Sequence, residues 1–172
     1  DNMVLRLTAE LEATHIKIIL SDPEGNWRSE LYADYKANRT DKARPLLLGR
    51  LKEYLRAAYG AFHWPGLEAD DVLGILATGP QDYPGGTIVV GRDKDFKSIP
   101  GLHFTLGDYG PSGKPVVREV TQRSADFFHL QQTLAGDRID GYPGCPGIGM
   151  ERAAKILAEP KLLVPQPGLV TR

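Results

Sequence analysis

Carboxylate side chains occur in four short groups that could together hold metal ions. Hard divalent cations such as Mg²⁺ prefer oxygen ligands, and two such ions can stabilise both the attacking and the leaving oxygen during phosphodiester cleavage. That chemistry needs several carboxylates, from different segments of the chain, to meet at one place. The candidates in chain order are Asp22, Glu68, Asp70, Asp71, Asp93, Asp95, Asp137 and Asp140.

The spacing within each group is compatible with joint use. Residues 68–71 fall where a helix is expected to begin, and negative charge there suits the helix dipole. Asp93 and Asp95 would point the same way on an extended chain, and residues 137–140 have the i, i+3 spacing of one helical face. Each group alone also has an ordinary explanation, because Asp is common in turns and acidic residues often cap helices. Four groups at the ends of expected elements favour a metal site.

Strands that alternate with helices are expected to position these groups. The β-branched apolar runs at 16–20 and 87–90 predict buried strands, and Asp22 and Asp93 each follow one of them. This alternation predicts an α/β fold with a mostly parallel central sheet flanked by helices. In such sheets ligands bind beyond the carboxyl ends of the strands. Helices are expected over 3–13, 45–59, 68–77, 121–134 and 150–157, and further strands over 103–106 and 116–120.

Composition and charge narrow the class of protein. The 172 residues suffice for one domain with a core, and 41% hydrophobic with 25% charged residues is ordinary for a globular protein. A run of 18 apolar residues is missing, so no membrane partner is expected, and a single Cys145 excludes an internal disulfide. A cytoplasmic location is predicted, which for a viral protein means the host cytoplasm.

The net charge of −1 conceals an uneven distribution. Without the eight candidate ligands, the chain has 14 acidic residues and 21 Lys and Arg residues. An acidic pocket set in a basic surface would result, and such a surface attracts phosphate.

Four motifs, in the same order, resemble those of the 5′-nuclease superfamily. This superfamily includes the 5′-nuclease domain of bacterial DNA polymerase I, flap endonucleases and phage 5′–3′ exonucleases. The motifs are WR…YKANR at 27–39, GLEADDVLG at 66–74, GRDKDF at 91–96 and GDRIDGYPGCPGIG at 136–149. The resemblance spans roughly residues 16 to 157, and the last motif is most similar to the small phage exonucleases. It implies a PIN-like α/β nuclease fold.

The resemblance also implies an activity and a set of site residues. The expected reaction is metal-dependent hydrolysis of phosphodiester bonds near the 5′ ends of duplex, flap or RNA–DNA hybrid substrates, by a two-metal-ion mechanism with Mg²⁺ or Mn²⁺. Asp22, Glu68, Asp70 and Asp71 would serve one ion, and Asp93, Asp95, Asp137 and Asp140 the other. The expected catalytic residues are Asp70 and Asp93, with Lys36 and Arg39 stabilising negative charge on the phosphate.

A DNA-binding surface follows from the same resemblance. The stretch 144–149 and the helix after it resemble a helix–hairpin–helix element, which holds K⁺ in the family and grips the duplex backbone. The expected DNA contacts are Arg28, Tyr35, Lys36, Arg39, Gly147, Gly149, Arg152 and Lys155. Ordinary packing remains an alternative for Tyr35, as does a solvated helix face for Lys36 and Arg39.

The expected domains are an α/β nuclease core over 1–120, a helix–hairpin–helix element over 121–159 and a tail or linker over 160–172. The family's first strand, with its "(I/V)DG" motif and metal-binding Asp, is expected to be missing. One alternative function is therefore a non-catalytic, structure-specific DNA-binding module with a crippled metal site. Another is a PIN-type ribonuclease, against which the glycines at 144–149 argue. Protein partners are not predicted.

Overall fold

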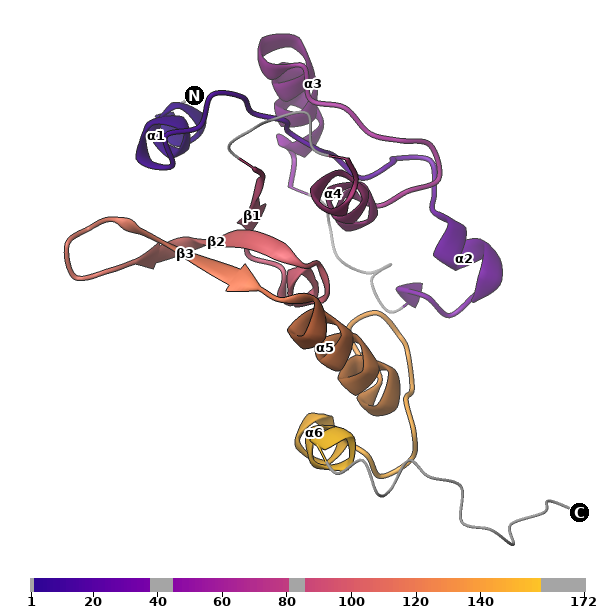
Figure 1. Cartoon of the computed structure of the whole chain (residues 1–172). Helices are drawn as coiled ribbons and strands as arrows, with labels where there is room; N and C mark the ends of the chain where they lie inside the picture. Colours follow the sequence, from indigo (N-terminus) through magenta and orange to yellow (C-terminus); the bar gives the residue numbers. More distant parts are fainter. Residues whose placement is uncertain (1, 38–44, 81–85, 159–172) are drawn as a thin grey trace, which may run out of the picture.

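A computed structural model describes residues 2–37, 45–80 and 86–158 as an α/β fold with a small mixed sheet (Figure 1). Arg39 and the predicted tail at 160–172 lie outside the described residues. The elements in order are α1 (Asn2–Glu10), α2 (Trp27–Leu31), α3 (Leu48–Tyr59), α4 (Ala69–Thr78), β1 (Ile88–Gly91), the 3₁₀ helix η2 (Lys94–Ser98), β2 (Gly101–Tyr109), β3 (Pro115–Val120), α5 (Gln122–Ala135) and α6 (Met150–Ala158).

The sheet has the order β1-β2-β3, with one parallel and one antiparallel pair among the described strands. Ile88 lies opposite Leu102 in the parallel pair, and Gly101 lies opposite Val120 in the antiparallel pair. The predicted α/β class is confirmed, whereas a mostly parallel sheet stays a prediction. In the view of Figure 1, α1, α3 and α4 lie above the sheet and α5 and α6 below it.

Two local expectations differ from the structure. The predicted strand at 16–20 forms an isolated parallel bridge between Ile19 and Phe62, after which the Asp22 N–H donates to Leu67 O at 3.0 Å. The segment after β1 is a 3₁₀ helix rather than an extended chain, because the Asp93 side chain accepts from Asp95 N and caps its first turn. Asp93 and Asp95 therefore come together through a turn and not through strand alternation.

Local sequence signals account for the helix ends. The helix expected over 121–134 is capped at its start by Thr121, whose hydroxyl accepts from Ser124 N at 3.2 Å. Glu68 and Asp71 form a capping box at the start of α4. α3 ends at Tyr59 and is followed by its C-cap Gly60, whose φ of 63° is a left-handed conformation that glycine adopts without a Cβ penalty.

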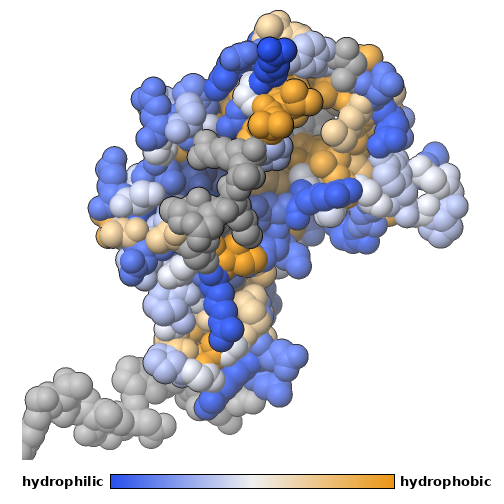
Figure 2. Space-filling model, turned by 180° about the vertical axis from the view of Figure 1, so that it is seen from behind, coloured by the Kyte–Doolittle hydropathy of each residue, from blue (hydrophilic) through white to orange (hydrophobic). Residues whose placement is uncertain are grey.

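The core is small and centres on the sheet. Phe104 of β2 is 1% exposed, and its ring meets Tyr109 edge to face at 5.5 Å. The other buried hydrophobic residues are Tyr35, Ala61, Val72, Val89, Ile99, Ala125 and Ala153. Seen from behind, hydrophobic side chains gather mainly in the upper half of the molecule, and hydrophilic ones cover most of the rest (Figure 2). None of the helices in the described ranges has the length and apolar character needed to span a membrane.

Replacing Phe104 by alanine tests where the core lies. Phe104→Ala removes a ring that is 1% exposed, so the free energy of unfolding should fall by about 3–5 kcal/mol. Urea unfolding followed by circular dichroism measures this. Leu46→Ala is the matched control, because Leu46 is 99% exposed and its truncation should cost less than about 0.5 kcal/mol. Equal losses in the two variants would contradict a core centred on β2.

Candidate metal centre

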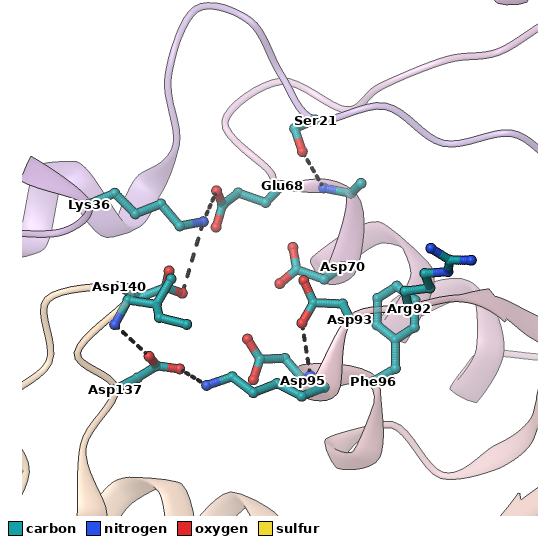
Figure 3. A pocket seen from close by; sticks show the side chains of 13 residues that line it. Ser21, Lys36, Glu68, Asp70, Arg92, Asp93, Asp95, Phe96, Asp137 and Asp140 are labelled. Carbon is teal, nitrogen blue, oxygen red and sulfur yellow. Dashed lines mark hydrogen bonds and ion pairs between the residues drawn. The ribbon is translucent and has the colours of Figure 1, made fainter. Parts of the chain in front are cut away.

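Six of the eight predicted carboxylates line one pocket, which α4, the segment from β1 to η2 and the turn at 137–140 surround. Figure 3 shows the carboxyl groups of Glu68, Asp70, Asp93, Asp95 and Asp140 turned toward a common space. The Arg92 guanidinium points away from them. The six acidic residues are Glu68, Asp70, Asp93, Asp95, Asp137 and Asp140.

Asp95, Asp137 and Asp140 form the tightest group, with one oxygen of each within 4.8 Å of the others. Gln132 of α5 orients Asp95 by donating from Nε2 to Oδ1 at 2.6 Å. Ile139 N donates to Asp137 Oδ1 at 2.9 Å. Lys94 Nζ lies 2.5 Å from the other oxygen of Asp137. Hydrogen bonds from α5, from the 137–140 turn and from Lys94 therefore hold carboxylates of two distant segments in place.

The segment 137–142 is a turn, so the expected helical face was wrong. Asp137 and Tyr142 form an antiparallel bridge with backbone hydrogen bonds of 2.9 and 2.8 Å. The turn brings Asp137 and Asp140 to the same side without helical periodicity. Its base is a close approach of two glycines: a Cβ on Gly136 would lie 2.5 Å from Tyr142 O, and one on Gly144 would lie 2.6 Å from Ala135 O.

Gly144→Ala should therefore cost more than a left-handed conformation alone. Gly144 has a φ of 62°, and Gly60 has a φ of 63° but nothing within 4 Å of an added Cβ. Both alanine variants incur the roughly 1–2 kcal/mol cost of a left-handed residue, while Gly144→Ala also forces the backbone of the turn apart. Thermal unfolding should show a clearly larger loss for Gly144→Ala. Equal losses would mean that the close approach at Gly144 contributes nothing.

The first turn of α4 supplies the opposite side of the pocket. Ser21 Oγ accepts from Ala69 N at 3.1 Å, which ties the 18–22 segment to this turn. Lys36 Nζ donates to Glu68 Oε1 at 2.6 Å and lies 4.0 Å from Asp140 Oδ2. Lys36, which has a left-handed φ of 55°, thus lies between the two acidic groups.

Tyr35 belongs to a packed cluster of tyrosines. Its ring lies 5.5 Å from that of Tyr142, which stacks on Tyr32 at 5.6 Å. Tyr35 is 6% exposed, and its hydroxyl donates to Glu68 Oε2. This burial agrees with the packing alternative for Tyr35, and its contact with DNA stays a prediction.

Asp22 and Asp71 are engaged elsewhere. The Asp22 carboxylate accepts from Glu24 N at 3.0 Å and from Gly66 N at 2.7 Å, so it stabilises the loop before α4. Asp71 accepts two hydrogen bonds from Arg28, each of 2.7 Å. Arg28 is thus directed at this carboxylate, and its role as a DNA contact stays a prediction.

Electrostatics in the pocket follow from crowding of like charges. Burial raises the pKa of Asp70, and the neighbouring charges of Glu68 and Asp71 raise it further. Burial also acts to raise the pKa of Asp137, but hydrogen bonds from Lys94 and Ile139 outweigh it and the pKa is lowered. Because carboxylate oxygens dominate the donor set, the lining fits a hard divalent cation.

Sequence reasoning missed three contributors to this pocket. Lys94 stands between Asp93 and Asp95 in the GRDKDF motif, and this position is the one sequence signal for its ion pair with Asp137. Gln132 reaches Asp95 from α5, 37 residues away, and Ser21 reaches α4 across 48 residues. Pairings at such separations have no local sequence signal.

The predicted backbone-gripping residues lie on and before α6, which packs against α5. Cys145 N donates to Leu134 O at 2.8 Å, which joins the intervening loop to α5. Arg152 is exposed and donates to Gly147 O at 3.3 Å. Gly147 and Gly149 have nothing within 4 Å of an added Cβ, and Lys155 is exposed.

Comparison with known proteins agrees with this geometry. The exodeoxyribonuclease of Enterobacteria phage T3 is 36% identical over 144 residues, which are 81% of this chain and 46% of the relative. The exonuclease of Escherichia phage T7 is 34% identical, covering 84% of this chain and 48% of the relative. The flap endonuclease Xni of Shewanella oneidensis is 32% identical, covering 84% and 57%. The chain thus spans about half the length of the curated relatives it matches.

Solved structures show the same fold. The 5′-exonuclease of T5 with zinc bound superimposes with a TM-score of 0.68 at 20% identity, covering 96% of this chain and 70% of the other. The T5 D15 protein co-crystallised with metal ions gives a TM-score of 0.67 at 21% identity, covering 91% and 65%. Residues 1–120 match the family described as the 5′–3′ exonuclease N-terminal, resolvase-like domain. This chain therefore belongs to the 5′–3′ exonuclease family, as its four motifs indicated.

Proposed function

We propose that this chain is a divalent-metal-dependent 5′-nuclease domain, which hydrolyses phosphodiester bonds near 5′ ends or flaps of DNA. The observation that carries the proposal is the convergence of six carboxylates from three segments on one pocket. Relatives named exonuclease, exodeoxyribonuclease and flap endonuclease support it. RNA–DNA hybrids are proposed as further substrates, and the cytoplasm as the place of action.

Mg²⁺ or Mn²⁺ is the proposed cofactor, with two ions in the pocket. Glu68 and Asp70 would hold one ion, and Asp93, Asp95, Asp137 and Asp140 the other. Such ions, when bound, activate water and stabilise charge on the phosphate oxygens. The T5 5′-exonuclease with zinc bound and the T5 D15 protein co-crystallised with metal ions support this proposal. Asp22 and Asp71, which the structure engages elsewhere, remain candidates only for indirect support of the site.

Lys36 is the proposed phosphate contact. Its ammonium group lies 2.6 Å from Glu68 Oε1 and 4.0 Å from Asp140 Oδ2, at the edge of the acidic pocket. A phosphate that approaches the pocket would meet this charge, which can stabilise the additional negative charge of the transition state. Arg39 is proposed to assist, although it lies outside the described residues.

The segment from α5 to α6 is proposed to be a helix–hairpin–helix that grips the duplex. Gly147, Gly149, Arg152 and Lys155 would contact the phosphate backbone, with K⁺ held by the loop. These contacts position DNA without reading its sequence. The proposed division is a nuclease core over 1–120 and a DNA-binding element over 121–159.

Cleavage of a flap duplex tests this function. A DNA duplex with a 5′-labelled flap is incubated with the full chain in Mg²⁺, and in parallel with excess chelator, and the products are sized on a gel. Short labelled products in Mg²⁺ that vanish with chelator are expected. A protein that binds the flap equally in both conditions and never cuts it would refute the nuclease proposal and favour a non-catalytic DNA-binding module.

A further inference from the structure

Arg28 and Asp71 form the best-made ion pair near the pocket. Nη1 donates to Oδ2 and Nη2 to Oδ1, each at 2.7 Å, so the contact is bidentate. The side chains are 20% and 15% exposed. The guanidinium also lies 4.7 Å from the Trp27 ring centroid. Both of its terminal nitrogens thus face protein acceptors.

Asp71 connects Arg28 to the acidic residues that line the pocket. Its Oδ2 also accepts from Glu68 N at 3.0 Å and completes the capping box of α4. Arg28 Nη1 lies 3.6 Å from Glu68 Oε2. Asp71 itself is outside the pocket lining, whereas Glu68 and Asp70 on the same turn belong to it. The Arg28–Asp71 pair therefore stabilises the first turn of α4 from outside the pocket lining.

We propose that Arg28 is a positioning residue for the nuclease reaction, which acts through Asp71 to hold Glu68 and Asp70 at the pocket. Neither Arg28 nor Asp71 contacts phosphate or metal in this account. The inference rests on the proposed nuclease function. The opposing assignment makes Arg28 a phosphate contact at the DNA surface.

Replacing Arg28 by lysine distinguishes a phosphate contact from a positioning residue. A phosphate contact needs a positive charge, which Lys also supplies. A bidentate clamp needs two parallel donors, which Lys does not have. Arg28→Lys keeps the charge but not the two parallel donors, and circular dichroism checks that this variant is folded. It should lower Mn²⁺ affinity and kcat by about 10- to 100-fold while the KM for the DNA stays within about two-fold.

The test combines three measurements on the full chain: Mn²⁺ binding by electron paramagnetic resonance, steady-state cleavage of a 5′-labelled flap duplex, and the salt dependence of flap binding in chelator. Arg28→Gln should leave the slope of log K against log salt unchanged, because no phosphate contact is lost. Arg152→Gln, which removes a proposed phosphate contact, should reduce that slope by about one.

A double variant shows whether Arg28 acts through Asp71. Arg28→Gln and Asp71→Asn should each lower Mn²⁺ affinity by about 10- to 100-fold, and the double variant should be no worse than either. Additive losses would overturn the proposal, as would a slope reduced by one in Arg28→Gln or full Mn²⁺ affinity in Arg28→Lys. Mn²⁺ binding decides this even if the wild type does not cut the flap, an outcome that would refute only the nuclease function.

Discussion

Asp95→Asn combined with Asp137→Asn is expected to slow cleavage of a 5′-labelled flap duplex in Mg²⁺ severely. The two side chains belong to the tightest acidic group, in which one oxygen of each of three carboxylates lies within 4.8 Å of the others. Amides would replace two of the proposed charged ligands, so several kcal/mol of transition-state stabilisation would be lost. A loss of about 4 kcal/mol corresponds to roughly a 10³-fold fall in rate, and single-turnover kinetics measures it.

Asp126→Asn is the matched control for this variant. Asp126 is exposed on α5 and accepts from Gln122 Nε2 at 2.8 Å, away from the pocket lining. Its cleavage rate should stay within about two-fold of the wild type. If the double variant cleaves as fast as Asp126→Asn, the carboxylates of Asp95 and Asp137 take no part in the reaction.

Lys36→Ala is the second variant with a large expected effect. Lys36 carries the charge that lies between Glu68 and Asp140, at 2.6 and 4.0 Å. Loss of one donor that stabilises transition-state charge costs roughly 10²- to 10³-fold in kcat, so a fall of this size is expected. Lys36→Arg keeps the charge and should recover part of the rate. Steady-state kinetics separates kcat from KM.

A change confined to KM would contradict this role for Lys36. Such a result would mean that the ammonium contributes equally to ground-state and transition-state binding. Lys36→Ala also removes a counter-charge from Glu68, so folding is checked by circular dichroism before the rates are compared.

Local sequence patterns predicted the elements better than the contacts between them. The helix expected over 45–59 corresponds to α3, and the helix expected from Thr121 corresponds to α5. These signals reside in a few neighbouring residues. The extended form expected for 93–95 failed because Asp93 caps a 3₁₀ turn. The helical face expected for 137–140 failed because the Gly136–Gly144 approach closes a turn there.

In the candidate site, too, sequence patterns predicted the residues better than the contacts between them. Motifs predicted all six acidic residues that line the pocket, since carboxylates after strands and at helix starts meet at one edge of the fold. Motifs alone did not reveal that Asp71 is engaged by Arg28, or that Tyr35 is packed against Tyr142. Those assignments depend on partners more than 40 residues away, which spacing does not encode.

Direct measurement of Mn²⁺ binding tests the central claim, that the carboxylate pocket holds divalent ions. Electron paramagnetic resonance is recorded while Mn²⁺ is titrated into the wild type, Asp95→Asn/Asp137→Asn and Asp126→Asn. Saturable binding is expected for the wild type and for Asp126→Asn, and loss of that binding for the double variant. Equal binding by all three proteins would contradict this claim and would locate any bound metal outside this pocket.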